Sequence, residues 1–595
     1  MTSRVPTGLP LLAFAGAAYV LVSSVSLGGG SPIPWLALGL GALLCLALKG
    51  WGSCLILVSL ALYPCALHSP VPLIQAALAG QLVLTRPILL HLVVWGALAL
   101  FDVARSGRQS GRHGTARYAT LLEARRAPGL SGRAARLRLL NHQGGAPLYD
   151  RSGYSVLCEA PTGSGKTAGT IIPAVLEWPG SLVVVDVKGE IFEQTSGYLA
   201  SRGVDVVCLD PDGPVHGYNP LATVRRDSHV EIDARNLSRI LTNPRGRPLV
   251  GNEIHFVDNA TTLLTAAILR GIEGDPEGVT LADVFYLLSS ELKTELRSWL
   301  DSGNTTVRLT AERFLPHVSE SGTSREFMSI HSTALTALDL FKEPLMAKLT
   351  SASSFSPSTL KDRRQAIYYL ATTPARLATT AAYVRLLFQG VIETLTRVGE
   401  GRRHEVLLVL DEFPVLGRFE FLVDAFGWMR SYGIRALVAI QGYSQLRNLY
   451  GANEVVSLHT RTKIVYPGTD IASSDQLSRY LGRQTIATES KSSSYGRHPS
   501  SGKTRSETGR ELLMPDEVRA LSPESAFVLT QGCRPIKARP ALWFRDGSLR
   551  KKVALGAAAL TQDPKLRDFS PLRRPAPEDV LVPAQDRELT HLVDV

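Results

Sequence analysis

Cysteine is scarce in this chain, with six residues among 595. Three of them, Cys45, Cys54 and Cys65, lie in apolar stretches near the N-terminus, and the others are isolated along the chain. None has the close spacing of a zinc site, and they do not form the framework of a disulfide-rich secreted domain. The sequence therefore argues against both classes and fits a protein that works in a reducing compartment.

Charge is almost absent from the first hundred residues. Between residues 6 and 85 there is one Lys, Lys49, and no Arg, Asp or Glu. Apolar stretches cover residues 9–27, 33–48, 54–67 and about 83–101, and about 20 apolar residues span a bilayer as a helix. We predict a transmembrane region over residues 1–104 with about four helices, and two spans with re-entrant pieces are the alternative. A signal peptide would also explain the first stretch, but no small-residue cleavage site follows it.

Arginines follow the last apolar stretch, at positions 105, 108, 112 and 117. Because Lys and Arg gather in cytoplasmic loops, this end of the last span is predicted to be cytoplasmic. With four spans the N-terminus lies on the same side. The bulk of the chain is then cytoplasmic, and it is long enough for several domains. The net charge of +11 suits nucleic acid or anionic lipid, and also plain solubility beside a membrane.

A glycine-rich segment, A-P-T-G-S-G-K-T, lies at residues 160–167, between a short apolar strand pattern and helix-forming sequence. Backbone N–H groups in such a loop surround phosphates, and the following helix adds the positive end of its dipole. We predict that the loop binds ATP, with Lys166 at the β- and γ-phosphates and the Thr167 hydroxyl on Mg²⁺. Ala160 stands where the pattern has its first Gly. The predicted nucleotide-binding residues are Pro161, Thr162, Gly163, Ser164, Gly165, Lys166 and Thr167.

Two acids end the apolar run at residues 406–410. An unbroken apolar run predicts a buried parallel strand, and active sites of open α/β sheets lie at the carboxyl ends of such strands. Asp411 is therefore predicted to hold the Mg²⁺ shell and Glu412 to polarise the attacking water. Gln441, after the strand predicted at residues 436–440, can sense the γ-phosphate or orient the water, or simply end the strand. Asp186, after the strand at residues 181–185, can face the metal or form a surface turn.

Strand and helix patterns alternate after residue 150, which predicts an α/β fold with a parallel sheet and right-handed crossovers. Between about residues 225 and 352 the apolar spacing is helical instead and predicts an all-α insertion, which can contact substrate or only stabilise the fold. A Ser-, Gly- and basic-rich segment at residues 488–510 predicts a mobile loop. The predicted strands cover residues 155–158, 181–185, 205–209, 367–370, 406–410, 436–440 and 462–465, and helices between them include residues 375–397, 419–432 and 472–481.

Several short motifs, in this order, resemble the type IV secretion coupling proteins, the TraG/VirD family of conjugative ATPases. They are G-T-A-R-Y-A at residues 114–119, D-V-K-G-E at 186–190, N-P-L at 219–221, D-E-F-P-V-L-G-R at 411–418, Q-G-Y-S-Q-L at 441–446 and L-L-M-P-D-E-V at 512–518. The sequence departs from the family pattern at Ala160, Val187 and Gly442, and in having more apolar spans than the usual two.

The resemblance implies a RecA-like P-loop NTPase domain with an all-α insertion domain, preceded by an N-terminal transmembrane helical region in the bacterial inner membrane. The chain then divides into a membrane region at 1–104, nucleotide-binding parts at 105–224 and 353–555, the insertion at 225–352 and a disordered tail at 556–595. The resemblance also implies a homohexamer with nucleotide sites between subunits. An arginine from a neighbouring subunit then stabilises transition-state charge. Arg430 is the candidate and Arg418 the runner-up.

The predicted function is ATP hydrolysis coupled to the transfer of single-stranded DNA and its attached relaxase toward the components of a type IV secretion channel. Lys166, Glu412, Gln441 and Arg430 are the predicted catalytic residues. Two alternatives stay open. The same motor can export protein effectors, or the protein can be a docking receptor that ATP switches without processive pumping.

Overall fold

The computed structural model describes residues 112–562, apart from residues 320–321, 372, 400–403, 453, 469 and 495–499. The predicted membrane spans at residues 9–101 and most of the predicted tail lie outside the described residues. Within the described part, no helix combines the length and apolar character needed to cross a bilayer. The described residues fall into two units, one with residues 116–484 and 509–562 and one with residues 112–115 and 485–508.

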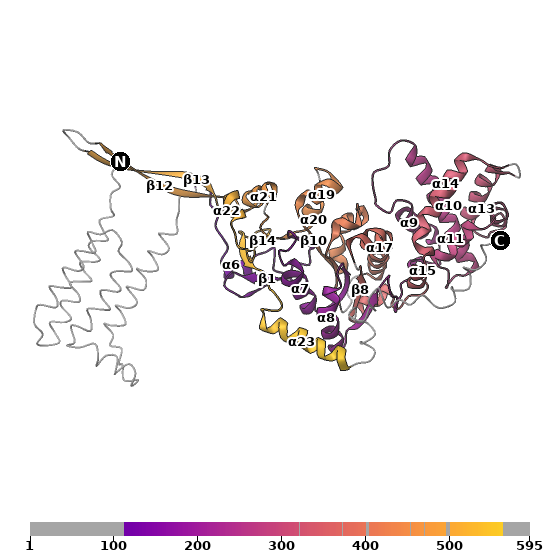
Figure 1. Cartoon of the computed structure of the whole chain (residues 1–595), viewed down its shortest axis with the longest axis horizontal. Coiled ribbons are helices and arrows are strands. Elements are labelled where there is room, and N and C mark those ends of the chain that lie inside the picture. The colour runs from indigo at the N-terminus through magenta and orange to yellow at the C-terminus, as the bar shows by residue number, and fades with distance from the viewer. Residues whose placement is uncertain are drawn as a thin grey trace, which may run out of the picture. The chain divides into compact units, whose positions relative to one another are not determined.

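The larger unit is built on one eleven-stranded sheet (Figure 1). Seven neighbouring strands are parallel, which confirms the predicted α/β fold with a large parallel sheet. The predicted strand bounds agree with the observed ones to within two residues at each end. In spatial order the parallel strands are β11 (Thr462–Val465), β3 (Val156–Glu159), β10 (Ile434–Ile440), β9 (Val406–Leu410), β4 (Ser181–Asp186), β8 (Gln365–Leu370) and β5 (Asp205–Leu209).

Four further strands extend the sheet beyond β11 in antiparallel fashion, and the sequence analysis did not predict them. They are β14 (Ala526–Thr530), β15 (Ile536–Arg539), β1 (Leu137–His142) and β2 (Pro147–Asp150). Thr462 of β11 lies opposite Thr530 of β14, and β1 pairs with both β15 and β2. Strands β1, β2 and β15 mix charged and apolar residues, so no unbroken apolar run marks them, whereas β14 has the short apolar run A-F-V-L at residues 526–529, which the sequence analysis missed.

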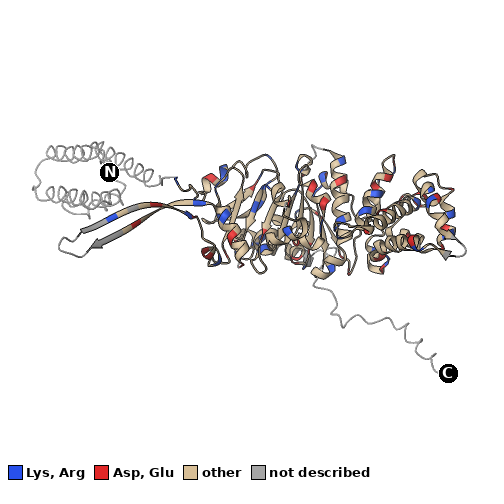
Figure 2. Ribbon diagram, turned by 90° about the horizontal axis from the view of Figure 1, so that it is seen from above, with Lys and Arg blue, Asp and Glu red and all other residues tan. Residues whose placement is uncertain are grey.

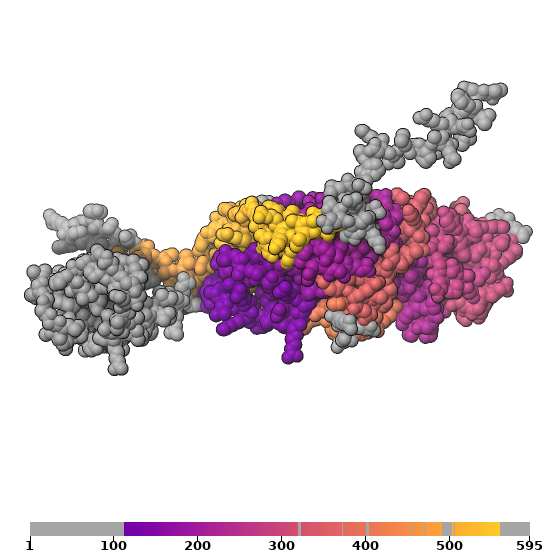
Figure 3. All heavy atoms as spheres, turned by 90° about the horizontal axis from the view of Figure 1, so that it is seen from below, coloured from indigo at the N-terminus to yellow at the C-terminus, as the bar shows by residue number. Residues whose placement is uncertain are grey.

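Both faces of the parallel sheet are buried, which explains the apolar runs. In β9, Val406, Leu408 and Leu410 belong to one apolar cluster, whereas Leu407 and Val409 belong to another. Helices α7 (Ile172–Glu177) and α8 (Glu190–Ser201) cover the second cluster, with α23 (Gly547–Gln562) packed on α8 (Figure 3). Helix α17 (Ala381–Val398) contributes to the first. Charged residues lie mostly on the helices and connections around the sheet (Figure 2).

Two predicted helices are interrupted in the structure. The helix predicted over residues 375–397 is α16 (Pro374–Thr379) followed by α17, and the Thr380 hydroxyl between them donates to the Arg376 carbonyl at 2.8 Å. The helix predicted over residues 419–432 is α18 (Glu420–Ala425) followed by the 3-10 turn η7 (Met429–Tyr432). The remaining helices of this part are α6 (Leu121–Arg126), α19 (Tyr443–Tyr450), α20 (Val456–His459), α21 (Ile471–Leu481) and α22 (Pro515–Arg519).

The chain between α9 and α15 is mainly helical. Capping boxes and caps start several of its helices, as where Thr280 accepts from the Asp283 N–H before α11 and Asn304 accepts from Thr306 before α13. A short pair of strands, β6 (Val318–Ser319) and β7 (Gly322–Thr323), interrupts it. The helices are α9 (Val230–Thr242), α10 (Asn252–Gly274), α11 (Leu281–Ser289), α12 (Leu292–Trp299), α13 (Thr305–Phe314), α14 (Arg325–Leu338) and α15 (Pro344–Leu349).

The segment at residues 488–510 is not a loop, so that prediction is wrong. It forms most of two paired strands, β12 (Arg483–Ser494) and β13 (Ser500–Glu511). The Thr488 and Ser506 hydroxyls are 2.7 Å apart between these strands. Hydroxyl-bearing side chains can bridge two strands in this way, and Thr also has high strand propensity. Composition rich in Ser therefore did not distinguish a loop from an exposed pair of strands.

Candidate nucleotide site

The glycine-rich segment at residues 160–167 leaves β3 at the carboxyl ends of the parallel strands. β3 lies next to β10, and β9 lies on the other side of β10. Asp411 and Glu412 directly follow β9, and Gln441 directly follows β10. Because neighbouring parallel strands end at the same edge, three segments that are far apart in the sequence converge on one site.

The backbone of the loop requires glycine at two positions. Gly163 and Gly165 have φ angles of +78° and +79°, in the left-handed region. A Cβ on Gly163 would meet no atom within 4 Å, so conformation and not space requires glycine there. Ala160, at the position of the absent first glycine, is fully buried, and its N–H donates to the Ile440 carbonyl at 2.9 Å. Alanine at this position therefore still anchors the loop to β10.

Lys166 reaches from the loop to the acids that follow β9. Its Nζ lies 2.7 Å from Glu412 Oε1 and 3.7 Å from Asp411 Oδ1, and it donates to the Asp411 carbonyl oxygen at 3.0 Å. The three side chains are largely buried, so the attraction between them is screened less than at the surface. The structure thus brings together three predicted site residues.

Thr167 faces the same acid. Its Oγ1 donates to Asp411 Oδ1 at 3.5 Å. Burial raises the pKa of Asp411 to about 6, against the opposing effect of Lys166, and Glu412 raises it further. A rise of this kind means that the nearby Lys166 does not fully offset the loss of water around the ionised carboxylate. A hydroxyl facing a buried carboxylate is the pair of oxygen ligands that Mg²⁺ accepts alongside phosphate oxygens.

Gln441 closes the site from the side of β10. The Thr162 hydroxyl donates to Gln441 Oε1 at 3.2 Å, and Gln441 Nε2 lies 3.3 Å from both carboxylate oxygens of Glu412. The amide therefore connects the loop to the predicted base. Of the two readings of Gln441, this contact favours a role in the site over a plain strand end.

The residues present fit a magnesium-bound nucleotide. Ser164 Oγ is buried and has no hydrogen-bond partner among the described residues, and a buried hydroxyl without a partner is costly. A phosphate oxygen held in the loop would supply the acceptor. Within the described part, no cluster of three or more His, Cys, Asp or Glu could hold a metal. Mg²⁺ is commonly held by one or two carboxylates together with substrate phosphates, which agrees with this arrangement.

Asp186 has a structural explanation. Its carboxylate accepts hydrogen bonds from the backbone N–H groups of Gly189 at 2.9 Å and Phe192 at 2.7 Å, at the start of α8. Burial raises its pKa to about 6, against these hydrogen bonds. Gly189 has φ +79° and allows the tight turn. Of its two predicted roles, the turn accounts for the contacts of Asp186, but the side chain is buried and does not lie at the surface as predicted.

Arg430 lies at the opposite, amino ends of the strands, just before β10. Its guanidinium carbon lies 4.1 Å from the centroid of the Tyr154 ring, and that of Arg461 lies 4.7 Å from the same centroid. Tyr154 precedes β3 and Arg461 precedes β11, which adjoin in the sheet. The structure therefore does not bring Arg430 to the loop of its own chain, and it adds Arg461, which sequence reasoning missed because no motif marks it.

The runner-up, Arg418, is engaged locally. Its Nε donates to Glu420 Oε1 at 2.7 Å, and its guanidinium lies 5.8 Å from the Tyr450 ring centroid. This pairing gives Arg418 a partner within its own chain. Arg430 has no carboxylate partner among the described residues.

The start of the helix after the loop carries a contact that sequence reasoning also missed. One π-helical turn, Thr167–Ile171, leads into α7. The N–H groups of Ala541 and Trp543 donate to the carbonyls of Gly169 and Ala168 at 2.9 and 3.1 Å. The segment before α23 thus packs against the base of the loop, and only the folded chain reveals this contact.

Comparisons with known proteins agree with the geometry. The sequence profile of the family described as "Type IV secretory system Conjugative DNA transfer" matches residues 132–567. The Protein VirD4 of Agrobacterium fabrum (strain C58 / ATCC 33970) is 30% identical over 484 residues, which cover 78% of this chain and 70% of the relative. A conjugal transfer protein TraG of Escherichia coli is 27% identical over 448 residues, covering 68% and 69% of the two chains.

The fold is similar to that of the plasmid coupling protein TrwB. The structure of TrwB in complex with ADP and Mg²⁺ superposes with a TM-score of 0.53 at 17% identity, covering 72% of this chain and 94% of the other. This likeness shows the fold alone. The family profile spans more than half of the sequence, and the chain therefore belongs to the type IV secretory system conjugative DNA transfer family.

Proposed function

We propose that this protein is the coupling ATPase of a conjugative type IV secretion system. It recruits a relaxase attached to single-stranded DNA and uses ATP hydrolysis to drive the DNA toward the channel components. The observation that carries the proposal is the convergence of Lys166, Thr167, Asp411, Glu412 and Gln441 at one edge of the parallel sheet. Membership in the conjugative DNA transfer family supports DNA as the substrate.

The nucleotide is held by the loop at residues 161–167 of a RecA-like domain. The backbone N–H groups and Lys166 bind the phosphates, and Thr167 and Asp411 hold Mg²⁺. When bound, Mg²⁺ neutralises charge on the phosphates and orients them. TrwB has been solved with ADP and Mg²⁺ and with the ATP analogue ADPNP, which supports the same ligands here.

Glu412 and Gln441 act on the attacking water. In this structure Lys166 Nζ contacts Glu412 at 2.7 Å, so Lys166 must exchange this carboxylate for phosphate when nucleotide binds. The exchange frees Glu412 to accept a proton from water. Gln441, hydrogen-bonded to Glu412, orients the same water. Catalysis of this kind rests on positioning and on electrostatic stabilisation.

Arg430 acts on the site of a neighbouring subunit in a homohexamer. It lies at the amino ends of the strands, whereas the loop lies at their carboxyl ends. In a head-to-tail ring each interface joins two different surfaces, so these two ends can meet between copies. A cation delivered in this way stabilises the charge of the transferred phosphoryl group.

The membrane region at residues 1–104 anchors the motor in the bacterial inner membrane, with four spans proposed and the rest of the chain cytoplasmic. The low charge and length of its apolar stretches support this part of the proposal. The division into nucleotide-binding parts at 105–224 and 353–555, an insertion at 225–352 and a tail at 556–595 belongs to the same proposal. Residues 556–562 form the end of α23, so the prediction of a disordered tail is wrong for these residues, and the proposed tail is limited to 563–595.

The test is Lys166→Ala in the full chain, measured by ATP hydrolysis with and without single-stranded DNA and by conjugative transfer in cells. We expect loss of hydrolysis and of transfer, with membrane insertion unchanged. Lys503→Ala is the matched control, because Gly502-Lys503-Thr504 repeats the end of the loop motif but lies in β13. Transfer at the normal rate by Lys166→Ala would refute the motor. If single-stranded DNA does not stimulate ATP hydrolysis by the unchanged protein, that result would favour effector export or a docking switch instead.

A further inference from the structure

A pocket of about 700 Å³ lies beside the helical part of the chain, away from the nucleotide site. One side is formed by α9 and the connection from α9 to α10, and includes Arg239. Another side is formed by α17 and by residues 418–421, and includes Arg385. None of the nucleotide-site residues lines this pocket. It therefore offers a separate binding surface.

Arg385 is a buried cation that forms no ion pair within 4 Å with any carboxylate of the described residues, although Glu420 is near enough to raise its pKa against the effect of burial. Its side chain is largely inaccessible, with 5% of the residue exposed. The guanidinium donates to the carbonyls of Asn243, at 3.3 Å, and Pro244, and lies 5.1 Å from the Phe419 ring centroid. Its Nε is buried and has no hydrogen-bond partner among the described residues. Burial lowers the pKa of Arg385 to about 10, so the group stays charged at neutral pH.

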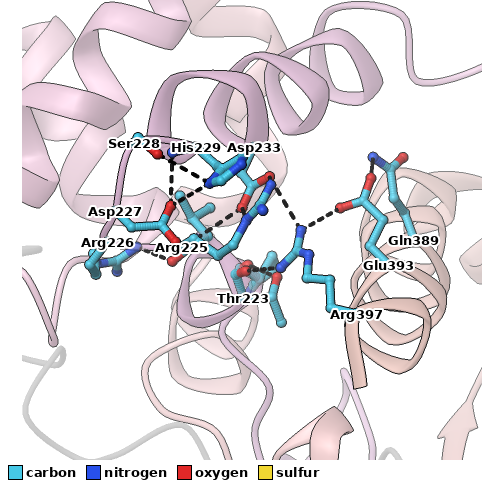
Figure 4. Close-up of polar contacts among 12 residues, drawn as sticks. Thr223, Arg225, Arg226, Asp227, Ser228, His229, Asp233, Gln389, Glu393 and Arg397 are labelled. Carbon is cyan, nitrogen blue, oxygen red and sulfur yellow. Dashed lines mark hydrogen bonds and ion pairs between the residues drawn. The ribbon is translucent and has the colours of Figure 1, made fainter. Parts of the chain in front are cut away.

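The acids beside the pocket are already engaged. Glu393 accepts a hydrogen bond from Gln389 at 2.8 Å and pairs with Arg397 at 3.2 Å, and Arg397 also pairs with Asp233 at 3.2 Å (Figure 4). Glu420, on the other side, pairs with Arg418. Each lining carboxylate therefore already has an arginine partner, and neither forms an ion pair with Arg385 or Arg239.

Arg239 lies at the solvent-exposed side of the pocket. It lies on α9, is solvent-exposed, and has no ion-pair partner among the described residues. Arg239 and Arg385 are therefore two positively charged side chains at which an anionic group of a ligand could bind. A buried charge is costly unless it is paired, so an anionic ligand in this pocket would relieve that cost for Arg385, and the exposed Arg239 would add electrostatic attraction.

Apolar surface lies next to these cations. Ile254 of α10 is 46% exposed and Phe421 is half-buried, and both line the pocket. A groove that combines unpaired arginines with an aromatic ring is the combination by which proteins bind single-stranded nucleic acid, the cations on the backbone and the ring against a base.

We propose that this pocket binds single-stranded DNA, with Arg239 and Arg385 on phosphates and Phe421 against a base. The inference rests on the proposed function, since it locates the substrate of that motor. The pocket also adjoins the nucleotide site in sequence, because residues 418–421 follow Asp411 and Glu412 through the 3-10 turn η6 (Phe413–Leu416). The Arg418 N–H donates to the Arg245 carbonyl at 3.0 Å, which ties this segment to the α9–α10 connection.

The test measures binding of a fluorescein-labelled oligodeoxythymidine to the full chain by anisotropy over a range of salt concentrations. We expect Arg239→Gln to weaken binding about three- to tenfold at low salt and to reduce the salt slope by about 0.7, the value for one phosphate contact on a single strand. Arg239→Lys keeps the charge and should restore the slope. Arg385→Gln should also weaken DNA binding and reduce the salt slope. Arg385 is buried, so if Arg385→Gln does not fold, the result for Arg239→Gln still tests the proposal.

Arg235→Gln is the matched control, because Arg235 is exposed on the same helix and does not line the pocket. Its binding should equal that of the unchanged protein. A direct readout is photocross-linking of an oligonucleotide that carries 5-iododeoxyuridine, which should label the peptide containing Phe421.

Unaltered affinity and salt slope in both arginine variants would overturn the proposal. So would variants that lose binding of a labelled polyglutamate peptide but keep that of DNA, because the pocket would then take an acidic polypeptide. These failures are distinguishable from failure of the motor. If the arginine variants hydrolyse ATP and bind DNA as well as the unchanged protein does, the proposed motor stands and only the DNA-binding site proposed for this pocket is wrong.

Discussion

The two ends of the parallel strands differ in how their cations are satisfied. At the carboxyl ends, Lys166 is neutralised by Asp411 and Glu412 of the same chain. At the amino ends, Arg430 and Arg461 lie over the ring of Tyr154, and neither has an ion-pair partner among the described residues. The first end is arranged for a ligand that displaces internal ion pairs. The second presents two arginines without an ion pair among the described residues, which suits a site completed by two copies.

The largest effect is expected for a variant that removes the arginine at the amino ends of the strands. Arg430→Gln should reduce hydrolysis by about 10³-fold, as removal of such an arginine does elsewhere. Lys166→Ala is inactive for a different reason, at the other end of the strands. Mixed in equal amounts, the two variants should regain hydrolysis at about a quarter of their interfaces, since each needs one intact loop and one intact arginine.

A mixture of Lys166→Ala with Glu412→Gln is the control for that experiment. Both changes damage the same end, so no interface in the mixture is complete and activity should stay absent. Steady-state phosphate release measures all three cases. Failure of the first mixture to exceed the second would place Arg430 in a structural role within its own chain.

Glu412→Gln should reduce ATP hydrolysis less than Arg430→Gln does. The expected reduction is about 10²-fold or more, because the general base is lost. The amide keeps the size of the side chain, so binding of a fluorescent ATP analogue should persist. This separates the carboxyl end into residues that bind and residues that react. A variant with more than a tenth of normal turnover would remove Glu412 from the reaction.

Tyr154→Leu should lower hydrolysis by about three- to tenfold, because a cation over an aromatic ring is stabilised by about 0.5–2 kcal/mol. Tyr154→Phe keeps the ring and should behave almost as the unchanged protein. The loss in Tyr154→Leu should be recovered by mixing with Lys166→Ala, as for Arg430. Equal losses in both Tyr154 variants would show that the hydroxyl, not the ring, matters.

The smallest effect concerns the pH dependence of stability. The folded pKa of Asp411, about 6, lies above its ordinary value of 3.8, so the folded chain binds a proton between these values that the unfolded chain has lost. Ionised Asp411 therefore lowers stability as the pH rises through about 6. Without nucleotide or Mg²⁺, Asp411→Asn should melt about 2 °C above the unchanged protein at pH 7.5.

That difference should shrink as the pH falls below 6 and approach zero only near pH 3.8, where Asp411 becomes protonated in the unfolded chain as well. Thermal melts at several pH values measure it. Burial also raises the pKa of Asp186, and Asp411 contributes to that rise, so part of the measured difference comes from Asp186. A constant difference across the range would mean that the carboxylate carries no such penalty.

The carboxyl end was predictable from the sequence, and the amino end was not. Continuous apolar runs mark β9 and β10, and the loop motif marks its own position, so Lys166, Asp411 and Gln441 could be placed at one edge. Tyr154 and Arg461 precede their strands without any motif, and only the pairing of β3 with β11 brings them together. Three of the four antiparallel strands were missed for a related reason. In β1, β2 and β15 polar or charged residues interrupt the apolar ones, as Arg138 does in β1, so their pattern resembles that of connecting segments. The short run of β14 is apolar, and nothing about its pattern explains why it was missed.

The contact between residues 541–543 and the carbonyls of Ala168 and Gly169 sets a practical limit on shortened forms of the protein. A shortened chain that ends before residue 541 leaves the carbonyls of Ala168 and Gly169 without these hydrogen bonds and exposes the base of the phosphate loop. Residues 541–543 lie shortly before α23 (Gly547–Gln562), so a displacement of the start of α23 is transmitted to the helix that follows the phosphate loop within a few residues. A tag or partner held there can therefore report on, or interfere with, the catalytic cycle.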